Sequence, residues 1–155
     1  MSQDETYLRQ TFELARNSVR HQNQPFGALI IDADKNLLAS AENSELREDL
    51  TCHAEMNAVR IVARQKIPTE ILAKSTLYAS TEPCVMCTAA IIRSKIGRIV
   101  YGCSAERMSE IAKGGSLPIP CRDITSRCKR HIEVVGPMLE TEAAKVHLDY
   151  WPQKQ

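Results

Sequence analysis

Two short fragments of the sequence carry side chains that could do chemistry together. His53 and Glu55 lie two positions apart at the start of one predicted helix, and Cys84 and Cys87 follow Pro83 at the start of another. Cysteines three positions apart lie on one side of a helix, and two thiolates with one imidazole form a common zinc ligand set. Because three protein ligands leave one tetrahedral position open, the pattern predicts a catalytic zinc site.

Glu55 is the predicted proton carrier of this site. Residues two apart on a helix do not face each other, so His53 and Glu55 converge only just beyond the helix N-terminus. We therefore expect a centre that lies off two helix N-termini, whose free N–H groups favour thiolates. Two thiolates cancel the formal charge of zinc, so a water held there needs a proton acceptor such as Glu55.

Other interpretations fit parts of the pattern. Cys84 and Cys87 alone also suit a structural zinc site or two buried thiols, and His53 alone suits a structural histidine. The joint occurrence of these residues with Glu55 favours the open, catalytic site. We interpret Cys52 as a small buried residue. A fourth structural ligand would have to come from the remaining residues, none of which has paired spacing: Cys52, Cys103, Cys121, Cys128, His21, His131 and His147.

The elements that position these residues follow from apolar spacing and chain breakers. Alternation of strands and helices predicts an α/β fold, a three-layer α/β/α sandwich. Residues 113–121, rich in glycine and proline, are a candidate lid or interface loop. We expect Pro83 at the first position of its helix. Helices are predicted over 4–21, 52–66, 84–95, 105–112 and 139–151, and strands over 26–32, 37–42, 75–81, 97–102 and 131–136.

The composition is that of one globular domain, residues 1–155, with 43% hydrophobic and 25% charged residues. A net charge of +1 gives no support to nonspecific binding of nucleic acid. The N-terminus lacks the features of an export signal, and no apolar stretch approaches the roughly 18 residues that span a bilayer. We therefore expect a cytoplasmic protein without membrane anchoring, whose six cysteines are thiols or metal ligands.

Three segments carry a resemblance to a known family: residues 25–30, 51–60 and 77–91. They include the pattern His-x-Glu followed by Pro-Cys-x-x-Cys. The sequence resembles the zinc-dependent cytidine deaminase-like superfamily, and most of all its purine-acting branch, the guanine deaminases and tRNA adenosine deaminases. The resemblance covers roughly residues 4–112. It implies a mixed five-stranded sheet between helices, Zn²⁺ as cofactor and assembly as a homodimer.

The resemblance also assigns roles to single residues. His53, Cys84 and Cys87 match the zinc ligands, and Glu55 matches the proton shuttle. From the sequence alone, Asn43 is equally well a turn residue that ends a strand, and Phe26 is equally well a core residue. The residues that we expect to contact the substrate are Asn43, Phe26 and Ala54.

The function implied is hydrolysis of an exocyclic amine to a carbonyl, with release of ammonia. The expected substrate is a free nucleobase or nucleoside, a purine or related aminated heterocycle, and the alternative is an adenosine in a tRNA anticodon loop. A tRNA enzyme needs basic residues around its pocket. The C-terminal segment 138–151 is more acidic than basic, whereas Arg122, Arg127, Lys129 and Arg130 form a basic run that keeps the RNA alternative open. A third alternative is a zinc protein without catalytic activity.

The C-terminus supplies one further hypothesis. Asp149, Tyr150 and Trp151 form a polar and aromatic terminus on a chain with seven aromatic residues. We expect them to fold over the pocket of the same or the neighbouring subunit, providing an aromatic wall and a carboxylate. The alternative is an anchored terminal helix.

Overall fold

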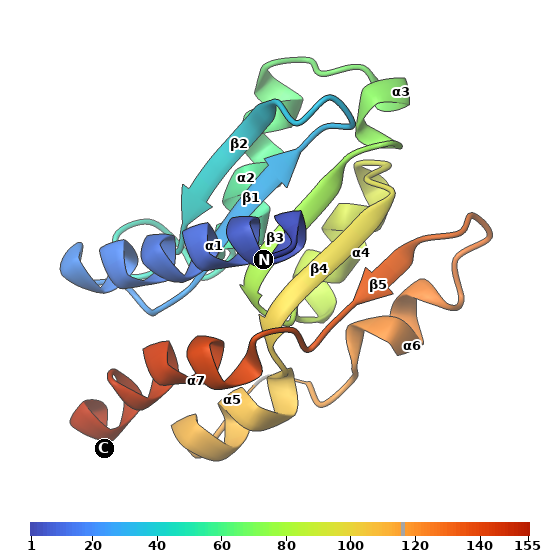
Figure 1. Ribbon diagram of the computed structural model, residues 1–155. Coiled ribbons are helices and arrows are strands. Elements are labelled where there is room, and N and C mark those ends of the chain that lie inside the picture. The colour runs from blue at the N-terminus through green and yellow to red at the C-terminus, as the bar shows by residue number, and fades with distance from the viewer. Residues whose placement is uncertain (116) are drawn as a thin grey trace.

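The fold is built around one mixed sheet, seen in a computed structural model that describes residues 1–115 and 117–155 (Figure 1). The strand order is β2-β1-β3-β4-β5. β1 pairs antiparallel with both of its neighbours, whereas β3, β4 and β5 run parallel. The expected mixed five-stranded sheet is confirmed. The strands are β1 (Gly27–Ile31), β2 (Leu37–Glu42), β3 (Thr76–Thr81), β4 (Arg98–Cys103) and β5 (Glu133–Val135).

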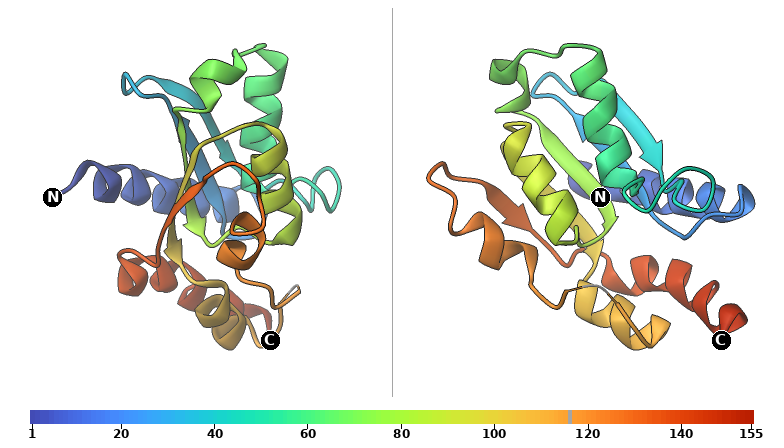
Figure 2. Two further views of the ribbon diagram at one scale, coloured as in Figure 1. Left: turned by 90° about the vertical axis from the view of Figure 1, so that its right-hand side faces the viewer. Right: turned by 180° about the vertical axis from the view of Figure 1, so that it is seen from behind.

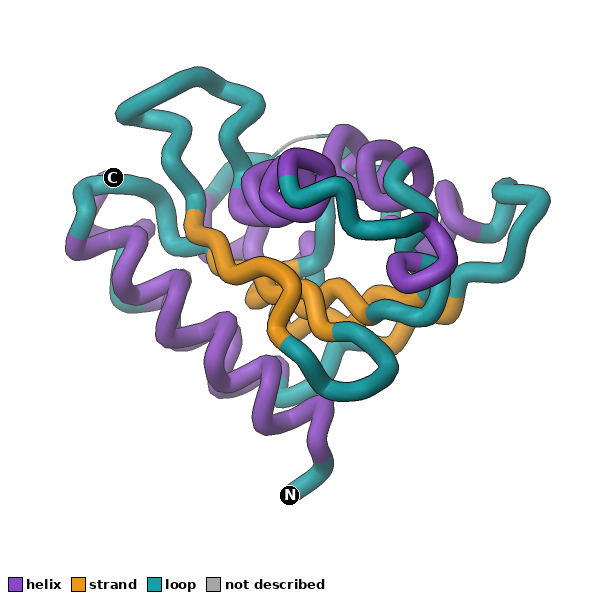
Figure 3. Tube along the Cα trace, turned by 90° about the horizontal axis from the view of Figure 1, so that it is seen from above, coloured by secondary structure: helices purple, strands orange, loops and turns teal. Residues whose placement is uncertain are grey.

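Helices cover both faces of the sheet, as Figure 2 shows. One face is covered by α1 and α7, with α5 beside α7, and the other by α2 and α4, with α6 beside α4. In the view from above, the strands lie between the two helical layers (Figure 3). The helices are α1 (Gln3–Arg20), α2 (Ala54–Arg64), α3 (Thr69–Leu72), α4 (Val85–Arg93), α5 (Ala105–Ala112), α6 (Cys121–Thr125), α7 (Glu140–Leu148) and the 3-10 helix η1 (Trp151–Lys154).

Burial of apolar side chains on both faces holds these layers together. Ile30, Leu77 and Ile99 point from the sheet into a core shared with α2 and α4. Their strand neighbours point the other way and pack on α1 and α7. All five residues of β1 are buried, as its continuous apolar run predicted, because neither face of this strand meets water.

The structure corrects several predicted boundaries. α2 begins at Ala54, two residues later than predicted, and α4 begins at Val85 with Cys84 as its N-cap, so Pro83 precedes the cap. α3 and α6 were not predicted because helices of four and five residues are too short to show helical periodicity. The predicted C-terminal helix is broken after Leu148. No helix in the described part of the chain is long and apolar enough to cross a membrane.

Candidate active site

The N-termini of α2 and α4 meet at one point and bring three predicted metal ligands together. His53 is the N-cap of α2, Cys84 is the N-cap of α4, and Cys87 lies in the first turn of α4. The Nδ1 atom of His53 lies 3.6 Å from Sγ of Cys84 and 3.4 Å from Sγ of Cys87. The centre therefore lies off two helix N-termini, as the spacing of the sequence predicted.

These three donor atoms fit a zinc ion. They lie within 4.8 Å of one another. Tetrahedral zinc with ligands at about 2.0–2.3 Å holds its donor atoms roughly 3.5 Å apart, close to the observed separations. Within residues 1–115 and 117–155, no fourth histidine, cysteine or carboxylate belongs to the group. The donor set is thus that of an open zinc site, and the fourth ligand that a structural site requires is not found among these residues.

The two cysteines share a proton in the metal-free state. The pKa of Cys84 is lowered to about 4, mainly because the thiol of Cys87 donates a hydrogen bond to it, with further help from His53 and the backbone N–H of Cys87. The pKa of Cys87 is raised because its proton is held by the Cys84 thiolate in a buried setting. Cys84 is therefore ready as a thiolate, and a dication would take the place of the proton on Cys87.

A carboxylate that the sequence reasoning missed lies behind the ligand histidine. Nε2 of His53 pairs with Glu45, whose side chain is only 11% exposed. Burial alone would lower the pKa of His53, but the hydrogen bond that it donates to the Cys84 thiolate and the charges of Glu55, Cys84 and Glu45 raise it to about 9. Such a carboxylate fixes the tautomer and orientation of a metal-binding imidazole. Glu45 lies in a loop, where no periodic signal points to it.

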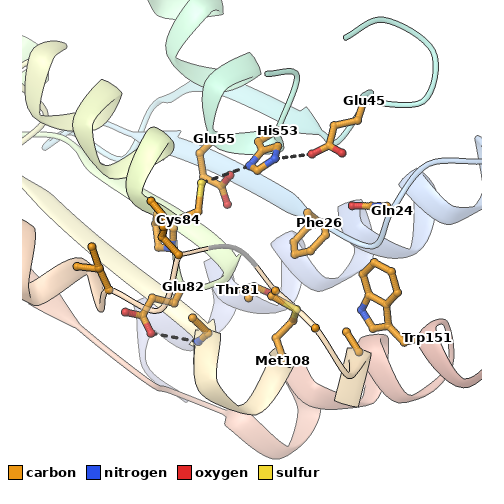
Figure 4. A pocket seen from close by; sticks show the side chains of 17 residues that line it. Gln24, Phe26, Glu45, His53, Glu55, Thr81, Glu82, Cys84, Met108 and Trp151 are labelled. Carbon is orange, nitrogen blue, oxygen red and sulfur yellow. Dashed lines mark hydrogen bonds and ion pairs between the residues drawn. The ribbon is translucent and has the colours of Figure 1, made fainter. Parts of the chain in front are cut away.

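Glu55 lies beside the ligand group and faces the same cavity. It is 4% exposed, and Figure 4 shows it near His53 and Cys84 at one end of the pocket. Burial raises the pKa of Glu55, and the nearby charge of His53 partly opposes this rise. A carboxyl group with a raised pKa can both accept and return a proton near neutral pH. Its position agrees with the predicted role of proton carrier.

The cavity has a volume of about 370 Å³. The wall away from the metal ligands is apolar and comes from η1, from α5 and from the segment 113–121, which was predicted as a lid or interface loop. Within that segment, Ser116 lies outside the described residues. The side chains and backbone that line it are Gln24, Phe26, Glu45, His53, Glu55, Thr81, Glu82, Pro83, Cys84, Ala105, Met108, Ala112, Gly114, Gly115, Leu117, Ile119 and Trp151.

One of the three residues expected to contact the substrate is among the described residues that line the cavity. Phe26 lines the cavity, whereas Asn43 and Ala54 are not among the described residues that line it. Ala54 is fully buried in the core between the sheet and α2. Asn43 is 1% exposed, and its Oδ1 accepts a hydrogen bond of 3.0 Å from the backbone N–H of Glu45. In this structure Asn43 therefore shapes the loop that carries Glu45.

The C-terminal hypothesis is confirmed for one residue of three. Trp151 lines the cavity and provides an aromatic wall near Phe26 (Figure 4). Asp149 and Tyr150 instead line a separate hollow beside the end of α1. Asp149 pairs with Lys145 one turn earlier, so it supplies no carboxylate to the cavity of its own chain. The break between α7 and η1 turns these neighbouring side chains in different directions.

This arrangement is suited to hydrolysis in a pocket whose surface is mainly apolar. His53, Cys84 and Cys87 would hold zinc, which when bound supplies a Lewis acid that makes water more acidic. Glu55 is placed to take a proton from that water and to return it to a substrate atom. The apolar wall limits the access of bulk water to the reacting atoms.

Comparison with known proteins agrees with this chemistry. The family model for the cytidine and deoxycytidylate deaminase zinc-binding region matches residues 1–103. A probable cytosine deaminase of Schizosaccharomyces pombe is 38% identical over 152 residues, covering 96% of this chain and 92% of the relative. A tRNA-specific adenosine deaminase of Haemophilus influenzae is 39% identical over 102 residues, covering 65% of this chain and 58% of the relative.

A solved structure shows the same fold. The guanine deaminase from Nitrosomonas europaea superposes with a TM-score of 0.83 at 23% identity, covering 98% of this chain and 86% of that protein. Because the matched family region contains every donor atom of the metal group together with Glu55, the chain belongs to the cytidine and deoxycytidylate deaminase family and is a zinc-dependent hydrolytic deaminase.

Proposed function

We propose that this deaminase acts on a free nucleobase, replacing its exocyclic amine by a carbonyl and releasing ammonia. The observation that carries the proposal is the charge of the cavity. Glu45, Glu55 and Glu82 line it, and the described lining residues include no lysine or arginine. Glu82 already accepts hydrogen bonds from backbone N–H groups and Glu45 pairs with His53, so Glu55 is the carboxylate left to face the N–H groups of an aminated ring, while all three repel phosphate. The site thus favours a base without its phosphate, and so disfavours nucleotides and RNA.

The shape of the cavity supports the same substrate class. A volume of about 370 Å³ lies near the lower end of the range for small-molecule sites. Phe26 and Trp151 offer ring faces on which a planar heterocycle can stack. A purine, preferred by the sequence resemblance, and cytosine, suggested by the relative from Schizosaccharomyces pombe, both fit this description.

In the proposed reaction Glu55 is the proton shuttle. It takes one proton from the attacking water and gives it to the ring nitrogen next to the amine-bearing carbon, and it then takes the remaining hydroxyl proton and gives it to the departing amine. Atoms balance because water supplies the carbonyl oxygen, one hydrogen that stays on the ring nitrogen and one hydrogen that leaves with ammonia. Backbone N–H groups at the starts of α2 and α4 face the same centre and stabilise negative charge there.

The tRNA alternative has weaker support in the structure, although a tRNA-specific deaminase is among the relatives. In the basic run, Arg122 and Arg130 donate hydrogen bonds to backbone carbonyls of Gly136 and of Ile96, respectively. Arg122 also bonds to the hydroxyl of Tyr101. These two charges stabilise the fold around β5, so the basic run is in part structural and offers less to a phosphate backbone.

Ammonia release from a panel of substrates tests the proposal. The zinc-loaded protein is incubated with guanine, adenine, cytosine, their nucleosides and nucleoside monophosphates, and an anticodon stem-loop. We expect activity on at least one free base and none on the monophosphates or the stem-loop, with Glu55→Gln as the inactive control. Activity on the stem-loop alone would establish the tRNA alternative, and zinc-loaded protein without activity on any substrate would indicate a non-catalytic zinc protein.

A further inference from the structure

His147 is a buried histidine that the proposed chemistry does not use. It lies on α7 and is 1% exposed. Its Nε2 lies 2.6 Å from Oγ1 of Thr81, and its Nδ1 lies 3.0 Å from Nε1 of Trp151. Its ring centroid is 5.4 Å from that of Phe26. All three of these neighbours line the substrate cavity, whereas His147 is not among the described residues that line it.

The hydrogen bonds define the tautomer of this ring. The indole N–H of Trp151 can only donate, so Nδ1 of His147 must be the acceptor. Nε2 then carries the proton and donates it to the hydroxyl oxygen of Thr81. Burial lowers the pKa of His147 to about 4, so the ring is neutral at physiological pH. Both ring nitrogens are thus fully used in a fixed arrangement.

We propose that His147 is a positioning residue, which holds Trp151 in place as the aromatic wall of the substrate cavity. Thr81 ends β3 and is separated from the ligand Cys84 by only two residues. The path from Trp151 through His147 to Thr81 therefore links the C-terminal segment to the strand that leads to the metal ligand Cys84. The inference rests on the proposed function, because it takes the ring face of Trp151 to contact the base.

The link matters because the other described contacts of the Trp151 ring are apolar packing, against the core beside α5 and α7, which restrains the angle of the ring less than a hydrogen bond does. Trp151 follows the break after Leu148 and belongs to a short 3-10 helix. Its other described aromatic contact is with Tyr150, an edge-on contact between centroids 4.7 Å apart. The single N–H of the indole is already donated to His147, so Trp151 offers the substrate only its ring surface. This residue should therefore act by stacking and should not read the pattern of hydrogen bonds on the base.

Tryptophan fluorescence tests the link directly, because Trp151 is the single tryptophan of the chain. We compare the wild type with His147→Ala, His147→Gln and Thr81→Val. In His147→Ala we expect emission shifted to longer wavelength and a KM for the preferred base raised about tenfold, with kcat within about threefold of the wild type. Glutamine offers both an acceptor and a donor, so His147→Gln should recover most of the emission and of the KM.

Two comparisons make the test decisive. Lys145→Ala lies on the same helix and removes an exposed partner of Asp149, so it should change neither emission nor KM. Thr81→Val keeps the shape of the side chain and the hydrogen bond between His147 and Trp151, so it should shift the emission and the KM less than His147→Ala does. It serves as the main variant if His147→Ala does not fold. The inference would be overturned if folded His147→Ala had the emission and the KM of the wild type. If His147→Ala does not fold, the same result in folded Thr81→Val would overturn it. Equal losses in kcat and thermal stability with an unchanged KM would show a purely structural role.

The fluorescence measurement needs no substrate. If no free base is deaminated, the proposed function fails while the emission of the variants still reports whether His147 orients Trp151. If a base is deaminated and the emission of His147→Ala is unchanged, the inference fails while the proposed function stands.

Discussion

At the scale of single residues, the site separates metal binding from proton transfer. Three side chains offer donor atoms to one point, and Glu55 faces the same cavity without belonging to that group. The low pKa of Cys84 and the raised pKa of Glu55 arise from opposite causes, hydrogen bonds to a thiolate in the first and loss of solvent in the second. A substitution of Glu55 should therefore lower turnover without lowering zinc content.

Replacing Glu55 tests this separation. Glu55→Ala should keep zinc and the fold but lower kcat by roughly a thousandfold or more, since proton transfer by a positioned side chain contributes factors of this order. Cys87→Ala should instead lose zinc, because a thiolate ligand is removed. Zinc content by atomic absorption and ammonia release at saturating substrate measure the two effects. Appreciable turnover in Glu55→Ala, or full zinc occupancy in Cys87→Ala, would contradict these assignments.

Glu45 should strengthen zinc binding through the ligand histidine. Glu45→Gln keeps the size of the side chain but removes the charge that orients and polarises His53, so we expect zinc affinity to fall about 10- to 100-fold. Competition with a chelator of known affinity measures the change. Glu48→Gln is the matched control, since Glu48 lies in the same loop but is exposed and bonds to Ser44. Equal affinities for the two variants would argue against a role for Glu45 in metal binding.

At the scale of elements, the site depends on how closely α1 approaches the sheet. Gly27 begins β1 directly after Phe26, which lines the cavity. A Cβ atom at Gly27 would lie 2.4 Å from the backbone oxygen of Thr11 and 2.6 Å from Cβ of Leu14. Real Cβ atoms do not approach other atoms so closely, so a larger residue would push α1 away from the strand.

We expect Gly27→Ala to lower the free energy of unfolding by about 1–3 kcal/mol, the usual cost of overpacking. Gly114→Ala is the control, because a Cβ there meets nothing within 4 Å among the described residues. It should change stability by less than about 0.5 kcal/mol. Urea denaturation of the metal-free proteins measures both. Equal stabilities of the two variants would show that α1 can shift without cost.

At the scale of the whole molecule, the C-terminal segment connects the helical layer of α1 and α7 to the cavity at the starts of α2 and α4. α7 covers the face of the sheet opposite to α2 and α4 (Figure 2). Trp151, which follows α7, nevertheless lines the cavity next to the starts of α2 and α4. His147 makes this connection through a neutral ring. Homodimer assembly and cytoplasmic location stay predictions, which mass measurement in solution and cell fractionation address.

The burial of His147 predicts a specific dependence of stability on pH. Its pKa in the folded chain is about 4, below its ordinary value of 6.5, so the unfolded chain binds the proton first. The contribution of the neutral ring is fully present above about pH 6.5 and is lost as the pH falls toward 4. The free energy of unfolding of the metal-free wild type should therefore fall relative to His147→Gln between pH 7 and 5. Parallel pH curves for the two proteins would show that His147 titrates normally.

The sequence by itself determined the parts of the protein that are local along the chain. His53 with Glu55 and Cys84 with Cys87 lie within one turn of a helix start, so their spacing already specifies which side chains can meet there. The continuous apolar run of β1 likewise predicted a strand covered on both faces. Short-range geometry of this kind depends on backbone periodicity, which sequence patterns express directly.

Only the tertiary structure decided which distant residues complete the site. Glu45 lies in a loop and Trp151 follows a broken helix, so neither carries a periodic signal, and Asn43 turned out to support the loop of Glu45 from a buried position. His147 meets Thr81 across 66 positions of sequence. Such contacts depend on how the layers pack and where loops close, and packing is set by the sum of many weak interactions rather than by any local pattern.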